Sequence, residues 1–209
     1  MKERMRLKAE SPILKNDQSA KERLLEAGID LFAEKGYART SVREIVARAG
    51  VTKPVLYYYF KNKAGILRAI LDRAATEQDV MLAEAAGKTG MPLDRILELY
   101  RRIYRRVLQR QNLFKLLHNL IFGPRPCVPG YDVEQFHNKM VNAIKGIYLD
   151  GHPPSKTREQ EAEDAATLVL SLMDYCFHMD EVCPEASDAE RAERLLQLAF
   201  RGLASNFSS

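Results

Sequence analysis

Residues 41–60 read SVREIVARAGVTKPVLYYYF, two short segments with helical apolar spacing joined by a glycine turn. Ser41 and Glu44 have the spacing of a capping box, in which the hydroxyl and the carboxylate satisfy free amides at a helix start. Gly50 can end this helix, and Pro54 fits the first turn of the next because proline has no amide proton to lose there. Two helices of about eight residues joined in this way are the signature of a helix-turn-helix, whose second helix enters the major groove of DNA.

The residue types of the second helix suit contact with nucleic acid. Thr52 and Lys53 stand at its N-terminus, where backbone amides and the helix dipole favour phosphate. Residues 57–59 are all tyrosine and cannot all face a core, because successive helical residues point about 100° apart. At least one hydroxyl should therefore face outward, where a phosphate oxygen can accept its hydrogen bond. Leu56 and Phe60 are expected in the core.

The charge of the chain is divided unevenly. The net charge of +4 hides 16 Lys and Arg against 9 Asp and Glu in residues 1–74, and 16 against 19 in residues 75–209. A basic segment joined to a mildly acidic remainder indicates a polyanion-binding module on a larger body. With 46% hydrophobic and 29% charged residues, the chain has the composition of a folded globular protein.

Helical periodicity runs along almost the whole chain, which predicts an all-α protein. The expected helices cover approximately residues 19–35, 41–49, 54–60, 62–75, 93–110, 112–122, 131–150, 157–182 and 187–204. The sequence thus predicts a flexible basic arm over 1–18, a three-helix helix-turn-helix DNA-binding domain over 19–75, and a helical bundle for ligand binding and dimerisation over 76–209.

Many residues between Leu24 and Leu71 match a known pattern at fixed spacing. They are Gly36-Tyr37, Thr40-Ser41, Ile45, Ala49-Gly50-Val51, Lys53-Pro54, Leu56-Tyr57, Tyr59-Phe60 and Lys61-Asn62-Lys63. On these residues the segment resembles the DNA-binding domain of the TetR family of transcriptional regulators. The chain departs from that pattern at Tyr59, where many members carry histidine, and at Pro54, where glycine is common.

The resemblance implies a set of DNA contacts. The residues it assigns to them are Ser41, Arg43, Thr52, Lys53, Val55, Tyr57, Tyr58, Tyr59 and Lys63. Of these, the three tyrosines and Lys63 would clamp phosphates, while Thr52, Lys53 and Val55 would face the bases or the adjacent backbone. The resemblance also implies a homodimer on a palindromic double-stranded operator, released by a small-molecule effector, and most often a repressor. An activator of the same family is the alternative.

Two late segments favour dimerisation. Residues 165–179 are apolar on nearly every side, and residues 195–203 carry an apolar stripe wider than one neighbour needs. Two such helices from each of two chains would form a four-helix interface. The alternative is a monomer that buries both helices in one core.

The candidate effector contacts are soft and aromatic side chains at helical spacing. They are Tyr100, Tyr104, Phe114, His118, Phe122, Phe136, Met140, Met173 and Phe177. Apolar walls of this kind suit a flat or elongated hydrophobic molecule, although the same stripe also suits ordinary core. Beside it runs a basic stripe that is either solvated, paired with acids, or attractive to an anionic ligand: Arg101, Arg102, Arg105, Arg106 and Arg110.

Other classes of protein receive little support. Glu134 and His137 form only half of a di-iron motif. Cys176 and His178 point about 200° apart on one helix and cannot share a local metal site. We therefore expect no metal and no cofactor. An all-α enzyme with a DNA-binding head is the rival class, but no catalytic arrangement supports it. No apolar run is long enough to span a membrane, the first residues lack the apolar core of a secretory signal, and the expected location is the cytoplasm.

Overall fold

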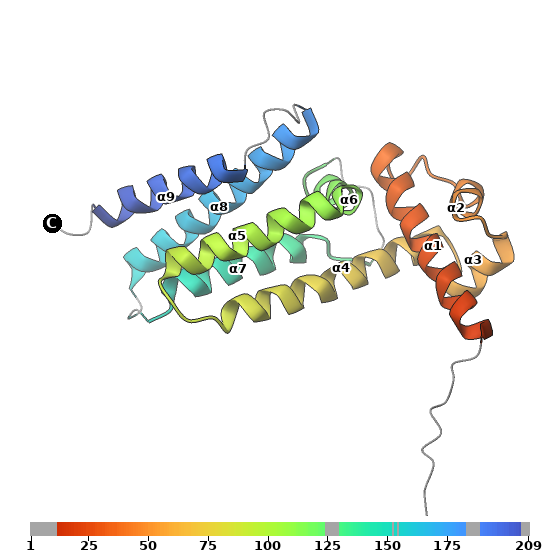
Figure 1. Ribbon diagram of the computed structural model, residues 1–209, viewed down its shortest axis with the longest axis horizontal. Helices are drawn as coiled ribbons and strands as arrows, with labels where there is room; N and C mark the ends of the chain where they lie inside the picture. The colour runs from red at the N-terminus through yellow and green to blue at the C-terminus, as the bar shows by residue number, and fades with distance from the viewer. Residues whose placement is uncertain (1–11, 124–129, 152, 154, 183–188, 206–209) are drawn as a thin grey trace, which may run out of the picture. The chain divides into compact units, whose positions relative to one another are not determined.

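The computed structural model describes residues 12–123, 130–151, 153, 155–182 and 189–205 (Figure 1). Over these residues every regular element is an α-helix, which confirms the predicted all-α class. The helices are α1 (Pro12–Lys35), α2 (Val42–Ala49), α3 (Lys53–Phe60), α4 (Lys63–Ala86), α5 (Pro92–Gln109), α6 (Gln111–Phe122), α7 (Glu134–Leu149), α8 (Lys156–Val182) and α9 (Ala189–Ser205).

The chain forms two compact units, and two of the three boundaries between them fall inside helices, in α4 and α6. The first unit is Met1–Arg73 with Lys115–Tyr131, and the second is Ala74–Phe114 with Asp132–Ser209. The sequence assigns all of 76–209 to one domain, whereas most of α6 lies with the first unit. Helical spacing identifies the buried face of α6 but does not say which core that face joins.

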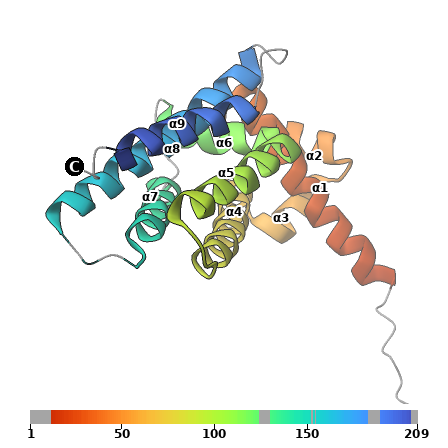
Figure 2. The same cartoon turned by 60° about the vertical axis from the view of Figure 1, so that its left-hand side comes forward.

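In the first unit, α1 packs against α2 and α3 (Figure 2). Its core is built from fully buried apolar side chains that recur at helical spacing, among them Leu24, Phe32, Ile45, Leu56 and Ile66. The helix α1 begins at Pro12 rather than near residue 19, so the last part of the expected arm is helical. Proline is tolerated at a helix start, and no further helix breaker follows it before Gly28.

The predicted capping box of α2, its glycine end and the proline start of α3 are present, and α4 is capped as well. Ser41 and Glu44 form the capping box of α2, and Gly50 ends that helix with φ 63°, the left-handed conformation that glycine adopts freely. Pro54 lies in the first turn of α3. The Asn62 Oδ1 accepts a hydrogen bond from the Gly65 amide at 2.8 Å and so caps α4.

The helix α4 is longer than the sequence analysis indicates. It continues past residue 75 to Ala86, with Met81, Leu82 and Ala85 buried along one side. The stretch 76–86 contains neither glycine nor proline, and the first break comes at Gly87. The polar run Thr76-Glu-Gln-Asp79 is compatible with a helix, because these side chains lie on its outer surface or meet partners on other helices.

The second unit is a helical bundle. In it, α5 packs against α7, α8 and α9, α7 packs against α8, and α8 packs against α9 (Figures 1 and 2). Fully buried residues from three of these helices meet in its core: Ile96, Leu99, Tyr100, Ile144 and Leu196. These helices position the side chains of the cavity described below.

A buried arginine joins three helix ends of this bundle. Arg95, only 7% exposed, pairs through Nη1 with the Asp150 carboxylate and donates from Nη2 to the Ala86 carbonyl oxygen at 3.2 Å. The start of α5 is thereby tied to the ends of α4 and α7. In the described part of the chain, no helix is both long enough and apolar enough to cross a lipid bilayer.

Candidate nucleic-acid interface

The nine residues that the resemblance assigns to DNA contact lie between the start of α2 and the start of α4, and none of them is buried. The exposed ones are Ser41, Arg43, Thr52, Lys53, Tyr57 and Tyr58. The partly buried ones are Val55, Tyr59 and Lys63. The short helices α2 and α3 and the turn between them therefore bring these side chains to one part of the molecule.

The face of α3 that points away from the core is built from tyrosine. Leu56 and Phe60 are 0% and 6% exposed, whereas Tyr57 and Tyr58 are 49% and 76% exposed. The Tyr58 and Tyr59 rings meet edge to face, with 4.9 Å between their centroids. The prediction that the three tyrosines cannot all enter the core is confirmed, and two of them face solvent.

The N-terminus of α3 carries unused hydrogen-bonding capacity. Thr52 is the N-cap residue in an extended conformation, and its side chain makes no capping hydrogen bond. Lys53 follows as an exposed first residue of the helix. A hydroxyl, an ammonium group and the positive end of the helix dipole thus stand together, an arrangement that favours an anion.

At the start of α2, Ser41 is engaged in capping. Its Oγ donates to Glu44 Oε2 at 2.7 Å and accepts from the Glu44 amide at 3.3 Å, while its own amide donates to Glu44 Oε2 at 2.8 Å. The Lys35 ammonium also binds the Glu44 carboxylate. The hydrogen bonds from Lys35 and then from Ser41 lower the pKa of Glu44 to about 2, so this carboxylate stays ionised but neutralised by Lys35.

A second ion pair orients α2 on α1. Arg48 donates from Nη1 to Glu34 Oε1 at 2.7 Å and from Nη2 to Glu34 Oε2 at 3.0 Å. This two-bond pairing lowers the pKa of Glu34. Arg48 is therefore occupied within the domain, while Arg43 and Lys53 are exposed. Lys61, which sequence reasoning did not assign to the site, is also exposed, and its place in the motif Lys61-Asn62-Lys63 is the signal that could have found it.

Lys63 lies differently from the other basic residues. Its Nζ donates to the carbonyl oxygens of Tyr37 and Thr40, both at 2.8 Å, and of Ala38 at 3.4 Å. The same Nζ is 4.3 Å from the centroid of the Tyr37 ring. Burial lowers the pKa of Lys63. This side chain points toward the turn between α1 and α2.

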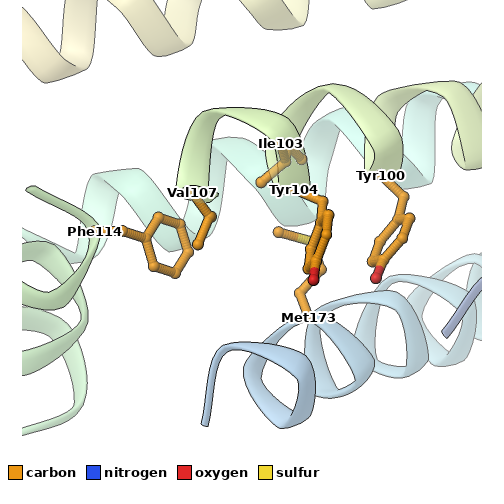
Figure 3. A pocket seen from close by; sticks show the side chains of 6 residues that line it. All are labelled: Tyr100, Ile103, Tyr104, Val107, Phe114 and Met173. Atoms are coloured by element: carbon orange, nitrogen blue, oxygen red, sulfur yellow. The ribbon is translucent and has the colours of Figure 1, made fainter. Parts of the chain in front are cut away.

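The second unit contains a small apolar cavity, about 230 Å³ including the part open to solvent. Its lining residues are Tyr100, Ile103, Tyr104, Val107, Phe114 and Met173 (Figure 3). The rings of Tyr100 and Tyr104 stack with centroids 6.0 Å apart and an interplanar angle of 18°. Met173 reaches toward them from α8 (Figure 3).

Four of the nine predicted effector contacts line this cavity: Tyr100, Tyr104, Phe114 and Met173. Among the side chains that the structure describes, the others do not line it. Phe136 and Met140 are buried on α7, His118 and Phe122 pair their rings on the part of α6 that lies in the first unit, and the Phe177 side chain lies outside the described residues. Ile103 and Val107 were not predicted, although with Tyr100 and Tyr104 they complete an i, i+3, i+4, i+7 face of α5.

The basic stripe of α5 is largely paired with acids, one of the interpretations that the sequence left open. Arg101 binds Glu193 of α9 through two bonds of 2.9 and 2.7 Å. Arg102 binds Glu84 at 2.7 Å, and Arg110 binds Glu77 at 3.0 Å. These pairs join α5 to α4 and α9.

Metal-binding groups do not gather in the described part of the chain. No three side chains of His, Cys, Asp or Glu there are placed to hold an ion together. The Cys176 side chain and the whole of Cys127 and Cys183 lie outside the described residues.

Comparison with known proteins finds similarity to one family of regulators. Residues 24–70 match the family model described as bacterial regulatory proteins, tetR family. The HTH-type transcriptional repressor Rv3405c of Mycobacterium tuberculosis is 32% identical over 110 residues, 49% of this chain and 57% of the relative. The HTH-type transcriptional regulator TtgR of Pseudomonas putida is 26% identical over 183 residues, 82% of this chain and 84% of the relative.

The same fold is found in a solved structure. SmeT, the repressor of a Stenotrophomonas maltophilia multidrug efflux pump, was solved in complex with triclosan and superposes with a TM-score of 0.64. That alignment covers 87% of this chain and 91% of SmeT, at 21% identity. The alignment with Rv3405c spans just over half of that relative's length. The helix-turn-helix at residues 41–60 and the family match over residues 24–70 identify a DNA-binding domain of the tetR type, and together with the helical C-terminal part they support a TetR family regulator.

Proposed function

We propose that the protein is a transcriptional repressor that binds a palindromic DNA operator as a homodimer in the cytoplasm and is released by a small hydrophobic effector. The outer face of α3 supports this proposal most directly. Thr52, Lys53, Tyr57 and Tyr58 are exposed there, while Leu56 and Phe60 anchor the helix in the core. Rv3405c and SmeT are both named repressors, which favours repression over activation.

The chemistry of this face suits a major groove. The Lys53 ammonium and the Thr52 hydroxyl stand at the N-terminus of the helix, which is the end that reads base edges in helix-turn-helix proteins. Tyr57 and Tyr58 lie about one to one and a half turns beyond Lys53, where their hydroxyls can donate to phosphate oxygens and fix the register of the helix. We therefore assign base reading to Thr52 and Lys53 and backbone positioning to the two tyrosines.

The DNA proposal is tested by selecting bound sequences from a random double-stranded library. We expect an inverted repeat, whose half-sites reflect the two-fold symmetry of a dimer. Lys53→Ala combined with Tyr58→Ala should weaken binding to the selected site by at least about tenfold, since good base contacts are each worth about 1–3 kcal/mol. Lys156→Ala, at the exposed start of α8, is the matched control and should bind as the parent does. Unchanged binding by the double variant would exclude α3 as the reading helix.

Apolar side chains on the last two helices support dimerisation. Tyr175 on α8 and Leu195 and Leu198 on α9 are 41%, 38% and 64% exposed. Apolar groups of this size on adjoining helices are covered when a second copy packs against them. The two copies then present two α3 helices to successive half-sites.

The effector proposal rests on the cavity beside Tyr104. The enclosed part of the cavity is only about 10 Å³, whereas small-molecule sites usually enclose about 300–1,000 Å³, so this cavity must widen considerably to accept a drug-sized ligand. Met173 and Tyr104 are only partly buried and can move without emptying the core. SmeT binds triclosan, a small aromatic compound, within the same fold. An effector releases DNA only if it binds the DNA-incompetent conformer more tightly.

Triclosan is the first probe for this site. It should raise the thermal unfolding midpoint of the free protein. It should also lower the affinity for the selected operator, and the operator should lower the affinity for triclosan by the same factor. Met173→Trp, which fills the cavity, should abolish both effects and leave DNA affinity unchanged. Leu108→Trp adds the same ring at an exposed site of α5 and is the control. If Met173→Trp still responds as the parent does, the effector site lies elsewhere.

A further inference from the structure

The turn between α1 and α2 has its carbonyl oxygens bound by side chains. Carbonyls at the end of a helix have no partner within the helix and need another donor. Arg39 Nε donates to the Lys35 oxygen at 2.7 Å. The Oγ1 of the buried Thr40 lies 2.9 Å from the Gly36 oxygen and 3.2 Å from the Leu31 oxygen, so that these two acceptors share its single proton.

Lys63 completes this set from the other end of the helix-turn-helix. An ammonium group has three N–H donors and no acceptor. Its three short contacts with oxygen atoms are to Tyr37, Ala38 and Thr40, at 2.8, 3.4 and 2.8 Å. The Tyr37 ring covers the group at 4.3 Å, a distance at which a cation is attracted to an aromatic face. Three carbonyl oxygens and an aromatic face thus surround the ammonium group within the domain.

We infer that Lys63 is a positioning residue for DNA binding: its ammonium holds the residue 37–40 turn, and with it the start of α2, and does not contact phosphate. The inference rests on the proposed DNA-binding function. Ser41 follows the turn directly and caps α2, so the backbone that Lys63 fixes is the backbone that presents Arg43. The Lys63 ammonium thus holds the first turn of α4 against the turn that joins α1 to α2.

Chemical labelling of the native protein tests this without a substitution. Acetic anhydride acylates a lysine only when the amine is deprotonated and released from its partners. In the free protein we expect Lys63 to react slowly, and Lys53 and Lys61, both exposed, to react quickly. Binding of the selected operator should protect Lys53 and leave Lys63 unchanged. Fast acylation of Lys63 in the free protein, or added protection of Lys63 by DNA, would overturn the inference.

Salt dependence separates a positioning lysine from a phosphate contact. Each phosphate contact contributes about −0.9 to the slope of log affinity against log salt for each subunit. Lys63→Met keeps most of the apolar stem and removes the donors, so we expect lower operator affinity with an unchanged slope. Lys53→Met is the comparison, because it removes an exposed cation that lies against the DNA in the proposed complex and should make the slope shallower. A shallower slope for Lys63→Met would contradict the inference.

Hydrogen exchange in the absence of DNA gives a third readout. The Thr40 amide donates to the Tyr37 oxygen, one of the atoms that Lys63 binds, so it reports on the turn itself. Lys63→Met should accelerate its exchange at least severalfold, while Lys61→Met should not. If no operator is found and no lysine is protected by DNA, the DNA-binding proposal fails. The exchange and the free-protein labelling still decide the role of Lys63 in the turn.

Discussion

Gly65 lies directly against the carbonyl of Phe60, so that a Cβ at position 65 would stand 1.9 Å from the Phe60 oxygen. The Gly65 amide meanwhile donates to Asn62 Oδ1 at 2.8 Å. The junction between α3 and α4 therefore has room for backbone atoms only. Because Phe60 anchors α3 in the core, a shift of the Phe60 carbonyl would move α3, the helix that carries Tyr57 and Tyr58.

Gly65→Ala should lower the free energy of unfolding by about 1–3 kcal/mol, since the obstructing atom is backbone and cannot rotate away. It should also weaken DNA binding through α3. Gly146→Ala is the matched control, because a Cβ there meets nothing within 4 Å in helix α7. That change should stabilise the protein by about 0.5–1 kcal/mol. Urea unfolding checks both, and equal effects of the two variants would refute the argument.

The capping carboxylate of α2 predicts a pH dependence of stability. The pKa of Glu44 is lowered to about 2 by its bonds to Lys35 and Ser41, below its ordinary 4.5. A folded-state pKa below the unfolded value means that the ionised group stabilises the fold above about pH 4.5 and that this contribution disappears as the pH falls toward 2. Glu44→Gln should therefore be less stable than the parent at neutral pH, and the difference should shrink as the pH falls from about 4.5 toward and through 2. Thermal unfolding across this range is the measurement, and a difference that stays constant with pH would count against it.

The buried guanidinium of Arg95 predicts an asymmetric pair of variants. Arg95→Met removes the group that satisfies the Ala86 carbonyl and should cost about 1–3 kcal/mol of unfolding free energy. Asp150→Asn should cost less, because the Asp150 side chain is 61% exposed and its amide oxygen can still accept. Denaturant unfolding at one fixed protein concentration compares them. A larger loss for Asp150→Asn would contradict this interpretation.

The exposed apolar residues of α8 and α9 predict the oligomeric state. Leu198→Glu places a charge on a side chain that is 64% exposed in one chain and covered in the proposed dimer. We expect the dimer to weaken by at least about tenfold, because burying an unpaired carboxylate costs more than about 1.4 kcal/mol. Light scattering after size exclusion measures this. Gln111→Glu, at the exposed start of α6, is the control for the added charge. A parent protein that is monomeric at micromolar concentration would refute the dimer.

The sequence was sufficient for local structure at the helix-turn-helix. The Ser41 capping box, the left-handed Gly50, the Pro54 helix start and the Asn62 cap are all set by residue chemistry within a few positions. The outward tyrosines also follow from helical spacing alone. Each of these features depends on neighbours in the chain, which is why a sequence pattern can predict it.

Features that depend on residues far apart in the chain could not be predicted from the sequence. Nothing in the local sequence distinguishes Lys63 from Lys61, yet the three carbonyls it binds lie 23 to 26 residues earlier. The same limit applies to the effector contacts. Phe136 has the residue type of a cavity wall, but only packing decides that it lies in core while Ile103 lines a cavity.

The outward face of α3 has a practical consequence for optical measurement. The chain contains no tryptophan, and the Tyr58 ring is 76% exposed. Tyr58→Trp would therefore introduce a single indole on that face without entering the core. Its fluorescence could be excited apart from the tyrosines, and quenching by stacked or nearby bases would follow occupancy of the operator in real time.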